Sequence, residues 1–302
     1  MSETAAPLSA RDAPVARPVQ QRRTTWSWLG VVPFFAFSIL FMILPIMFLV
    51  IGSFQDSSGN VTLKNYADLS QNFIVESYRN SIEISLVTAI GGGLFGFLLA
   101  YAVVLGGLPS WVRTALMTFS GVASNFAGVP LALAFIFTLG NVGLVTKFLL
   151  DTFGISLGDA GFSLYTKIGL EVVYMYFQFP LMVLIVAPAL DGLRREWREA
   201  SENLGATPAQ YWRHVAFPIL MPTLLGTVIL LFGNSFGAQA TAYQLSGGTI
   251  NLVTLVISSQ MRGDVLHNPG LGYALAMGMV VIMAGSIAAY ALLQRRSERW
   301  LR

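Results

Sequence analysis

Long stretches without a charged residue constrain this chain more than any other feature of its sequence. Six of them follow one another, at residues 24–55, 84–112, 114–146, 172–190, 214–261 and 265–294. A helix that crosses the hydrocarbon core of a bilayer needs about 20 predominantly apolar residues, so each stretch has room for one, the shortest only just. The longest turns polar and Gly-rich after Tyr243, and we therefore assign it one span followed by a loop.

The composition excludes a water-soluble protein. Of the 302 residues, 55% are hydrophobic and 11% are charged, whereas soluble domains carry about 25% charged residues. The net charge of +3 comes without a basic face of the kind that binds nucleic acid, so no nucleic-acid partner is expected. With no Cys and only His214 and His267, the chain offers little for thiol or metal chemistry, and we expect no metal site and no resident cofactor.

These observations predict an all-α polytopic membrane protein with six transmembrane helices. The expected spans are Trp28–Phe54, Asn80–Leu105, Thr114–Leu139, Ile168–Leu190, Phe217–Tyr243 and Leu271–Leu293. Basic residues near span ends stay on the cytoplasmic side, and only five of the 18 Lys and Arg residues fall on the side opposite the termini: Lys64, Arg79, Lys147, Lys167 and Arg262. We therefore expect both termini in the cytoplasm, residues 1–25 as a disordered tail and residues 26–302 as the transmembrane domain.

A few polar residues inside the expected spans are candidates for a solute pathway. Glu83 and Glu171 are the only carboxylates placed within helices, and an acidic group at membrane depth marks a functional site by default. Each is expected within about one turn of an outward-facing helix N-terminus, where the helix dipole also favours a negative charge. If they face a cavity, they favour a cationic solute.

Asn234, Ser235 and Gln239 lie on a small, polar stretch of the fifth span that predicts either a packing surface or the lining of a passage. The segment Gly233–Gly237 also matches G-x-S-x-G, the pattern of a serine nucleophile on a strand-to-helix turn. Here the pattern falls inside a predicted helix, and the two His residues lie on opposite sides of the membrane, out of reach of Ser235. We therefore expect no catalytic residue.

The loop between the fourth and fifth spans, residues 191–216, is the most informative part of the sequence. A charged, helix-favouring run ends at Gly205, and Thr207, Pro208 and Gln210 then form a capping box with proline at the first helical position. Two short helices that meet at a glycine elbow suit docking to a cytosolic protein. An amphipathic pair that rests on lipid headgroups fits the same pattern, and the residues alone do not separate the two.

This loop contains Glu199-Ala200-Ser201, followed by three residues, Gly205, nine residues and Val215-Ala216-Phe217-Pro218. The pattern resembles the E-A-A, x3, G, x9, I-x-L-P signature of permease subunits from binding-protein-dependent ABC importers. The spacing is kept, while Ser201 stands for the second Ala, Val215 for Ile and Phe217 for Leu. The resemblance covers about residues 26–300. It implies the type I importer fold and a coupling helix that docks on an ATPase, with contacts from Glu199, Ala200, Ser201, Gly205, Ala206, Thr207 and Pro208.

The same resemblance implies partners. They are two copies of a cytosolic ATP-binding subunit, a second permease subunit in a heterodimer, an extracytoplasmic solute-binding protein and the lipid of a bacterial inner membrane. A phosphate-binding loop requires G-K-[ST], and none of the three lysines follows a glycine. ATP and Mg²⁺ are therefore expected on the ATPase subunits, and this chain is expected not to be an enzyme.

Two questions stay open at this stage. An ion-coupled secondary transporter is the rival class, although such folds usually show internal repeats and ionisable sites near the midplane, which this sequence does not show. The C-terminal third, with Asn251–Thr254, Gln260 and Asn268–Gly270, resembles the spermidine/putrescine permease branch, whose relatives also move phosphonate, ferric iron, thiamine or sulfate. A polyamine or related amine is therefore the expected solute.

Overall fold

The computed structural model describes residues 31–56, 58–262 and 267–298, so the tail predicted to be disordered lies outside the described residues. Within these ranges the chain is almost entirely helical, with one isolated bridge between Gln55 and Val61. Six helical segments are long and apolar enough to cross a membrane: Val32–Ser53, Asn72–Leu105, Gly128–Phe153, Lys167–Asp191, Pro208–Phe236 and Pro269–Arg295. The predicted all-α fold with six spans is confirmed.

The first of these segments is apolar and continuous. It consists of α1 (Val32–Ser38), a π-helical turn (Ile39–Ile43) and α2 (Leu44–Ser53). The remaining helices are α3 (Lys64–Asp68), α4 (Asn72–Leu105), α5 (Ser110–Asn125), α6 (Gly128–Leu139), α7 (Leu144–Phe153), α8 (Lys167–Asp191), α9 (Arg195–Asn203), α10 (Pro208–Tyr211), a second π-helical turn (Trp212–Ala216), α11 (Phe217–Phe236), α12 (Gln239–Ser246), α13 (Val253–Arg262) and α14 (Pro269–Glu298).

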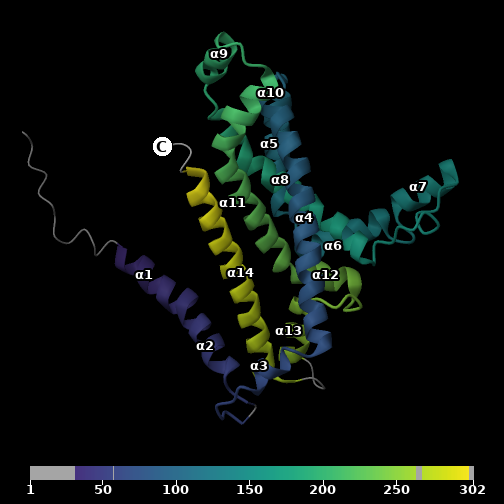
Figure 1. Ribbon diagram of the computed structural model, residues 1–302. Coiled ribbons are helices and arrows are strands. Elements are labelled where there is room, and N and C mark those ends of the chain that lie inside the picture. The colour runs from purple at the N-terminus through teal and green to yellow at the C-terminus, as the bar shows by residue number, and fades with distance from the viewer. Residues whose placement is uncertain (1–30, 57, 263–266, 299–302) are drawn as a thin grey trace, which may run out of the picture. The chain divides into compact units, whose positions relative to one another are not determined.

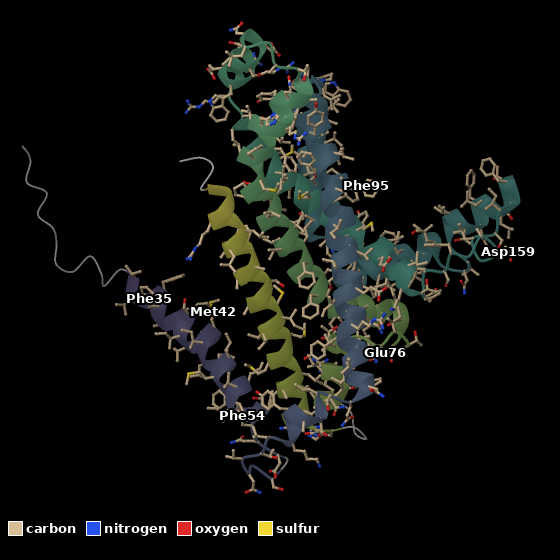
Figure 2. The ribbon with its side chains drawn as sticks, viewed as in Figure 1. Phe35, Met42, Phe54, Glu76, Phe95 and Asp159 are labelled. Atoms are coloured by element: carbon tan, nitrogen blue, oxygen red, sulfur yellow. The ribbon has the colours of Figure 1, made fainter. Side chains whose placement is uncertain are left out.

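Helix α4 is a single unbroken helix of 34 residues that packs along α8 and α11 (Figure 1). Small residues permit this close approach, because a Cβ added at Gly92 would lie 2.7 Å from Cβ of Gln178 on α8. A Cβ at Gly96 would lie 2.6 Å from the carbonyl oxygen of Phe179. These two glycines therefore allow α4 and α8 to pack closely. On the outer side of α4, Phe95 is 61% exposed and points away from the bundle, as a lipid-facing residue would (Figure 2).

The prediction that the third span, Thr114–Leu139, is a single helix is wrong. It is broken between α5 and α6, where Phe126 and Ala127 are extended and Gly128 has φ of +71°. Only glycine adopts that left-handed conformation without strain, and Pro130 then sits in the first turn of α6, where a missing N–H costs no helical hydrogen bond. The following helix α7 was not predicted and projects from α6 away from the bundle (Figure 1).

Two further sequence predictions need correction. The fifth span was expected to run to Tyr243, but α11 ends at Phe236 and a two-residue break separates it from α12. The segment after Tyr243 was expected to be a loop, yet it contains α13. Polar residues interrupt the apolar pattern of α13 in the sequence, but in the structure the helix packs against α4 and α14.

Candidate functional site

Helix α9 presents a charged surface at one end of the bundle, beyond α8 (Figure 1). Glu199 and Ala200 are exposed on it, whereas Ser201 is buried and its hydroxyl donates a 2.7 Å hydrogen bond to the carbonyl of Arg198. Nε of Arg198 donates a 2.9 Å hydrogen bond to Glu202, one turn further on. This bond raises the pKa of the Arg198 guanidinium above its ordinary value, so the group stays charged at any physiological pH.

Gly205 forms the elbow between α9 and α10. Its φ is +79°, and no atom lies within 4 Å of the position that a Cβ would take. The amides of Gly205 and Ala206 close the end of α9 on the carbonyls of Glu202 and Ser201, at 2.9 Å and 3.0 Å. The bend is therefore fixed by hydrogen bonds, and it requires glycine for its backbone angle rather than for space.

The predicted capping box starts α10. The amide of Gln210 donates to Oγ1 of Thr207 at 3.3 Å, and the amide of Thr207 donates to Oε1 of Gln210 at 2.7 Å, with Pro208 as the first helical residue. A hollow of about 330 Å³ opens beside the elbow, between α9 and the start of the fifth span. Its lining includes Ser201, Gly205 and Ala206, together with Leu204, whose side chain is 88% exposed.

The structure therefore brings the seven predicted docking residues together around the elbow: Glu199, Ala200, Ser201, Gly205, Ala206, Thr207 and Pro208. Five of them are exposed, Ala206 is half-buried and Ser201 is buried. Sequence reasoning did not identify Leu204 and His214 beside it. For Leu204, the available signal in the sequence was an apolar residue directly before the glycine elbow. The role of this surface in docking stays a prediction.

The predicted pathway carboxylates lie together but are partly neutralised. Glu83 is ion-paired with Lys167 at 3.3 Å, and both side chains are less than half exposed. Glu171 interacts electrostatically with both of them. The expectation that Glu83 lies within one turn of a helix N-terminus is wrong, because α4 begins at Asn72 and Glu83 lies about three turns further on. Glu171 does lie in the second turn of α8.

The other three predicted pathway residues point in different directions. Ser235 is buried, and its hydroxyl lies 3.0 Å from that of Thr88 on α4. Asn234 is exposed on another face of α11, where it lines a mostly apolar cleft of about 800 Å³ between α5, α8, α11 and α14. Gln239 begins α12 and lines a separate pocket. The five predicted pathway residues therefore do not form one site.

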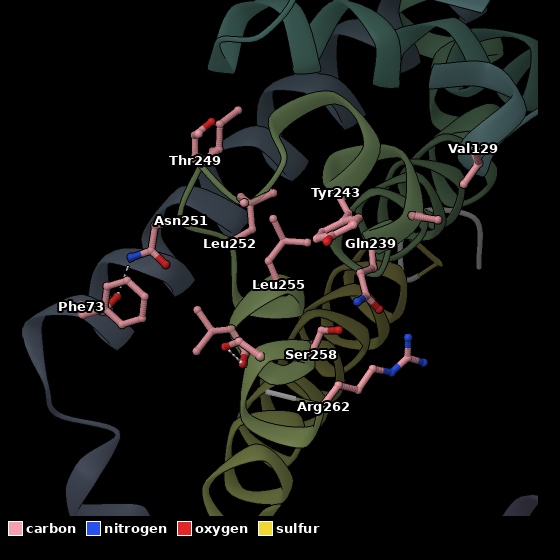
Figure 3. Close-up of a pocket in the computed structure, with 15 residues that line it drawn as sticks. Phe73, Val129, Gln239, Tyr243, Thr249, Asn251, Leu252, Leu255, Ser258 and Arg262 are labelled. Atoms are coloured by element: carbon pink, nitrogen blue, oxygen red, sulfur yellow. Dashed lines mark hydrogen bonds between the residues drawn. The ribbon is translucent and has the colours of Figure 1, made fainter. Parts of the chain in front are cut away.

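The pocket at Gln239 has a volume of about 880 Å³ and lies at the end of the bundle opposite α9 (Figures 1 and 3). It is open on one side and is lined by residues of α12, α13 and the loop between them, with Phe73 at the start of α4 and Val129 of α6. Arg262, at the end of α13, is its one charged lining residue among the described residues. The sequence did not predict this site because α13 was taken for loop.

Among the described residues, no group of three or more His, Cys, Asp or Glu side chains is placed to hold a metal ion. The Gly233–Gly237 segment ends a helix, and the hydroxyl of Ser235 is bound to Thr88. His214 lies instead on the second π-helical turn, where its Nδ1 is 3.0 Å from the carbonyl oxygen of Gln210. The arrangement offers an exposed surface around the elbow at one end and, at the other, a pocket whose lining is mostly apolar with a few polar side chains.

Known proteins resemble this chain over most of its length. A probable sulfate transport system permease protein cysT from Helicosporidium sp. subsp. Simulium jonesii is 29% identical over 229 residues, 74% of this chain and 79% of the relative. The spermidine/putrescine transport system permease protein PotB from Haemophilus influenzae is 25% identical over 295 residues, 89% of this chain and 96% of the relative.

The fold has a counterpart among solved structures. A chain of the bacterial alginate ABC transporter, crystallised in complex with an alginate pentasaccharide-bound periplasmic protein, superposes with a TM-score of 0.67 at 15% identity, over 90% of this chain and 98% of that one. At this identity the likeness shows the fold. Residues 92–299 match the family described as binding-protein-dependent transport system inner membrane component. This multi-pass membrane chain belongs to that family, the permease components of ABC importers.

Proposed function

We propose that this chain, paired with a second permease subunit, forms the membrane pathway of an ATP-driven importer with two separate ATPase subunits, one of which docks on α9 and α10 of this chain. The single observation that supports this most strongly is the fixed elbow at Gly205, which joins two short helices on an exposed surface at one end of the bundle. A docking element must be rigid to transmit movement, and the hydrogen bonds at this elbow provide that rigidity.

The orientation follows the same reasoning. Arg194, Arg195, Arg198 and Arg213 lie in or beside α9 and α10, and an excess of basic residues is retained on the cytoplasmic side of a membrane. We place the docking surface and both termini in the cytoplasm of a bacterium, with the chain in its inner membrane. The opposite end of the bundle then meets an extracytoplasmic solute-binding protein, as the periplasmic partner of the alginate transporter suggests.

Two classes of solute are supported by different observations. The PotB relative and the carboxylates Glu83 and Glu171 favour the polyamine or related amine expected from the sequence. The cysT relative favours sulfate instead, and the ion pair of Glu83 with Lys167 reduces the negative charge that would attract a cation. The permease function does not depend on this choice, because both classes use the same machinery.

The test is co-purification of the ATPase with this chain. Glu199→Lys reverses a charge on the docking surface, and Gly205→Pro cannot adopt the left-handed angle that joins α9 to α10. Each is expected to release most of the ATPase and to abolish ATP-dependent uptake. Asp159→Lys and Gly154→Pro are matched controls, since both positions are beyond or at the end of α7, remote from the docking surface.

Retention of the ATPase by both docking variants would contradict the proposal. Solute uptake driven by an ion gradient in vesicles that contain this chain alone would replace it with secondary transport.

A further inference from the structure

The walls of the 880 Å³ pocket are held in place by hydrogen bonds between helices. Nδ2 of Asn80 on α4 donates to the carbonyl of Asn251 at 3.0 Å, and Nδ2 of Asn251 donates to the carbonyl of Phe73 at 2.8 Å. The buried hydroxyl of Ser81 accepts a 2.9 Å hydrogen bond from the amide of Val253, the first residue of α13. These bonds fix the loop before α13 and the start of α13 itself against α4.

Helix α12 is attached in a similar way on the other side of the pocket. The hydroxyl of Thr241 donates to the carbonyl of Gly128 at 3.2 Å, where the chain breaks between α5 and α6. The hydroxyl of Tyr174 on α8 donates to the carbonyl of Ala238, directly before α12. The pocket is therefore a preformed space rather than a gap between mobile loops, and preformed pockets of this size are typical of ligand sites.

Four of the polar side chains that line this space, that of Tyr243 among them, have no hydrogen-bond or ion-pair partner among the described residues. Figure 3 shows the Gln239 amide, the Ser258 hydroxyl and the Arg262 guanidinium on the same side of α12 and α13. Among the described residues, no hydrogen bond or ion pair engages these three side chains. They supply free N–H and O–H donors, and Arg262 adds a permanent positive charge.

The same pocket offers little to a cation. No carboxylate is among its described lining residues. Of the two predicted pathway acids, neither lines it, and Glu83 is engaged by Lys167. A guanidinium flanked by neutral donors matches the oxygens of a compact oxyanion, which it binds through two parallel hydrogen bonds. A cationic amine would instead meet an uncompensated like charge.

We propose that this pocket takes a compact oxyanion on its way through the permease, with Arg262 as its charged contact and Gln239 and Ser258 as neutral donors. This rests on the proposed import function and identifies the class of solute that the pathway accepts. The space is far larger than a sulfate-sized ion, and its charged contact lies at one edge. Such a site holds its ion weakly, and a conduction site must release the ion that it attracts.

The absence of cysteine from the chain makes a direct test possible, since any introduced thiol is unique. In Ser258→Cys, assembled with its partner subunits, thiol labelling is measured with an anionic sulfonatoethyl and a cationic trimethylammonioethyl methanethiosulfonate, each normalised to its rate with a free thiol. We expect the anionic reagent to react faster. Adding Arg262→Gln should lower the ratio of anionic to cationic rate at least about fivefold, whereas Arg262→Lys should preserve it.

Arg79→Gln is the matched control. Arg79 is an exposed arginine in the half of α4 that contains Phe73, but it does not line the pocket. It should leave the ratio unchanged. Millimolar inorganic sulfate should slow labelling of Ser258→Cys, and spermidine at the same ionic strength should not.

Faster cationic labelling, protection by spermidine instead of sulfate, or protection by neither probe would overturn the proposal. The ATPase docking test uses the other end of the molecule, so any of these results leaves ATP-driven import standing. Loss of docking in turn does not alter the labelling ratio.

Discussion

Thr88 on α4 and Ser235 on α11 share a buried hydrogen bond, with 3.0 Å between their hydroxyl oxygens. Nε2 of Gln178 on α8 donates to the same Thr88 oxygen at 2.9 Å. One threonine side chain thus joins three helices in the interior of the bundle, and the Gln178 side chain that it anchors is fully buried.

Thr88→Val tests this junction, since valine keeps the shape of threonine and removes its hydroxyl. Nε2 of Gln178 and the hydroxyl of Ser235 would lose their common partner. We expect the free energy of unfolding to fall by about 0.6 to 1.7 kcal/mol, the range measured for hydrogen bonds between membrane helices. The measurement is thermal unfolding of the purified chain in detergent.

Thr138→Val is the control for Thr88→Val. The Thr138 hydroxyl is exposed and bonds only to carbonyls of its own helix, Ala134 and Phe135. Its loss should change stability by a few tenths of a kcal/mol at most. Equal effects of the two substitutions would show that the three-helix junction adds nothing to stability.

Gly96→Ala should destabilise the contact between α4 and α8. The new Cβ would lie 2.6 Å from the Phe179 carbonyl oxygen and 2.5 Å from Cβ of Met182, so the helices must separate, at a cost of about 1 to 3 kcal/mol. Gly121→Ala on α5 has open space around its Cβ and should be neutral or stabilising by about 0.5 to 1 kcal/mol. Folded yield and melting temperature in detergent measure whether each substitution lowers or raises stability.

The ion pair between Arg113 and Asp191 links the start of α5 to the end of α8, with 2.5 Å between Nη2 and Oδ2. Both side chains are more than two-fifths exposed, and exposed pairs contribute about 0 to 1 kcal/mol. Arg113→Ala should therefore lower the melting temperature only slightly, and the effect should vanish at high salt. A large loss that persists in 1 M salt would mean that Arg113 acts through packing rather than charge.

Thr207→Ala removes one half of the capping box at α10 and leaves the Gln210 amide without its acceptor. N-cap replacements of this kind cost about 0.5 to 2 kcal/mol of helix stability, and here the cost falls on the proposed docking surface. We expect weaker ATPase binding in a pull-down titration, with the melting temperature of the membrane bundle almost unchanged. Thr207→Ser keeps the hydroxyl and should restore binding; if it does not, the capping oxygen is not the cause.

The sequence predicted well those features that depend on local chemistry. Six spans followed from apolar length, the capping box from Thr207 and Gln210, and the bend from Gly205.

What the sequence could not predict depends on contacts between distant segments. The break before Gly128 was missed because it lies inside the uncharged stretch 114–146, whose length alone suggested one continuous span. The start of α13 and the loop before it depend on Asn80 and Ser81, whose bonding partners lie 171 and 172 residues away in the sequence. Without that contact, the pocket and the position of Arg262 in it could not be foreseen, and Glu83 could not be matched with Lys167.

The unbroken length of α4 has a mechanical consequence. At about 1.5 Å per residue, its 34 residues reach about 50 Å, well beyond a hydrocarbon layer of about 30 Å. Near one end its Tyr101 ring contacts Trp212, next to α10, and near the other its Asn80 and Ser81 hold the base of α13. Because α4 is unbroken between these two contacts, a tilt imposed on it beside α10 also displaces its opposite end, where it holds α13.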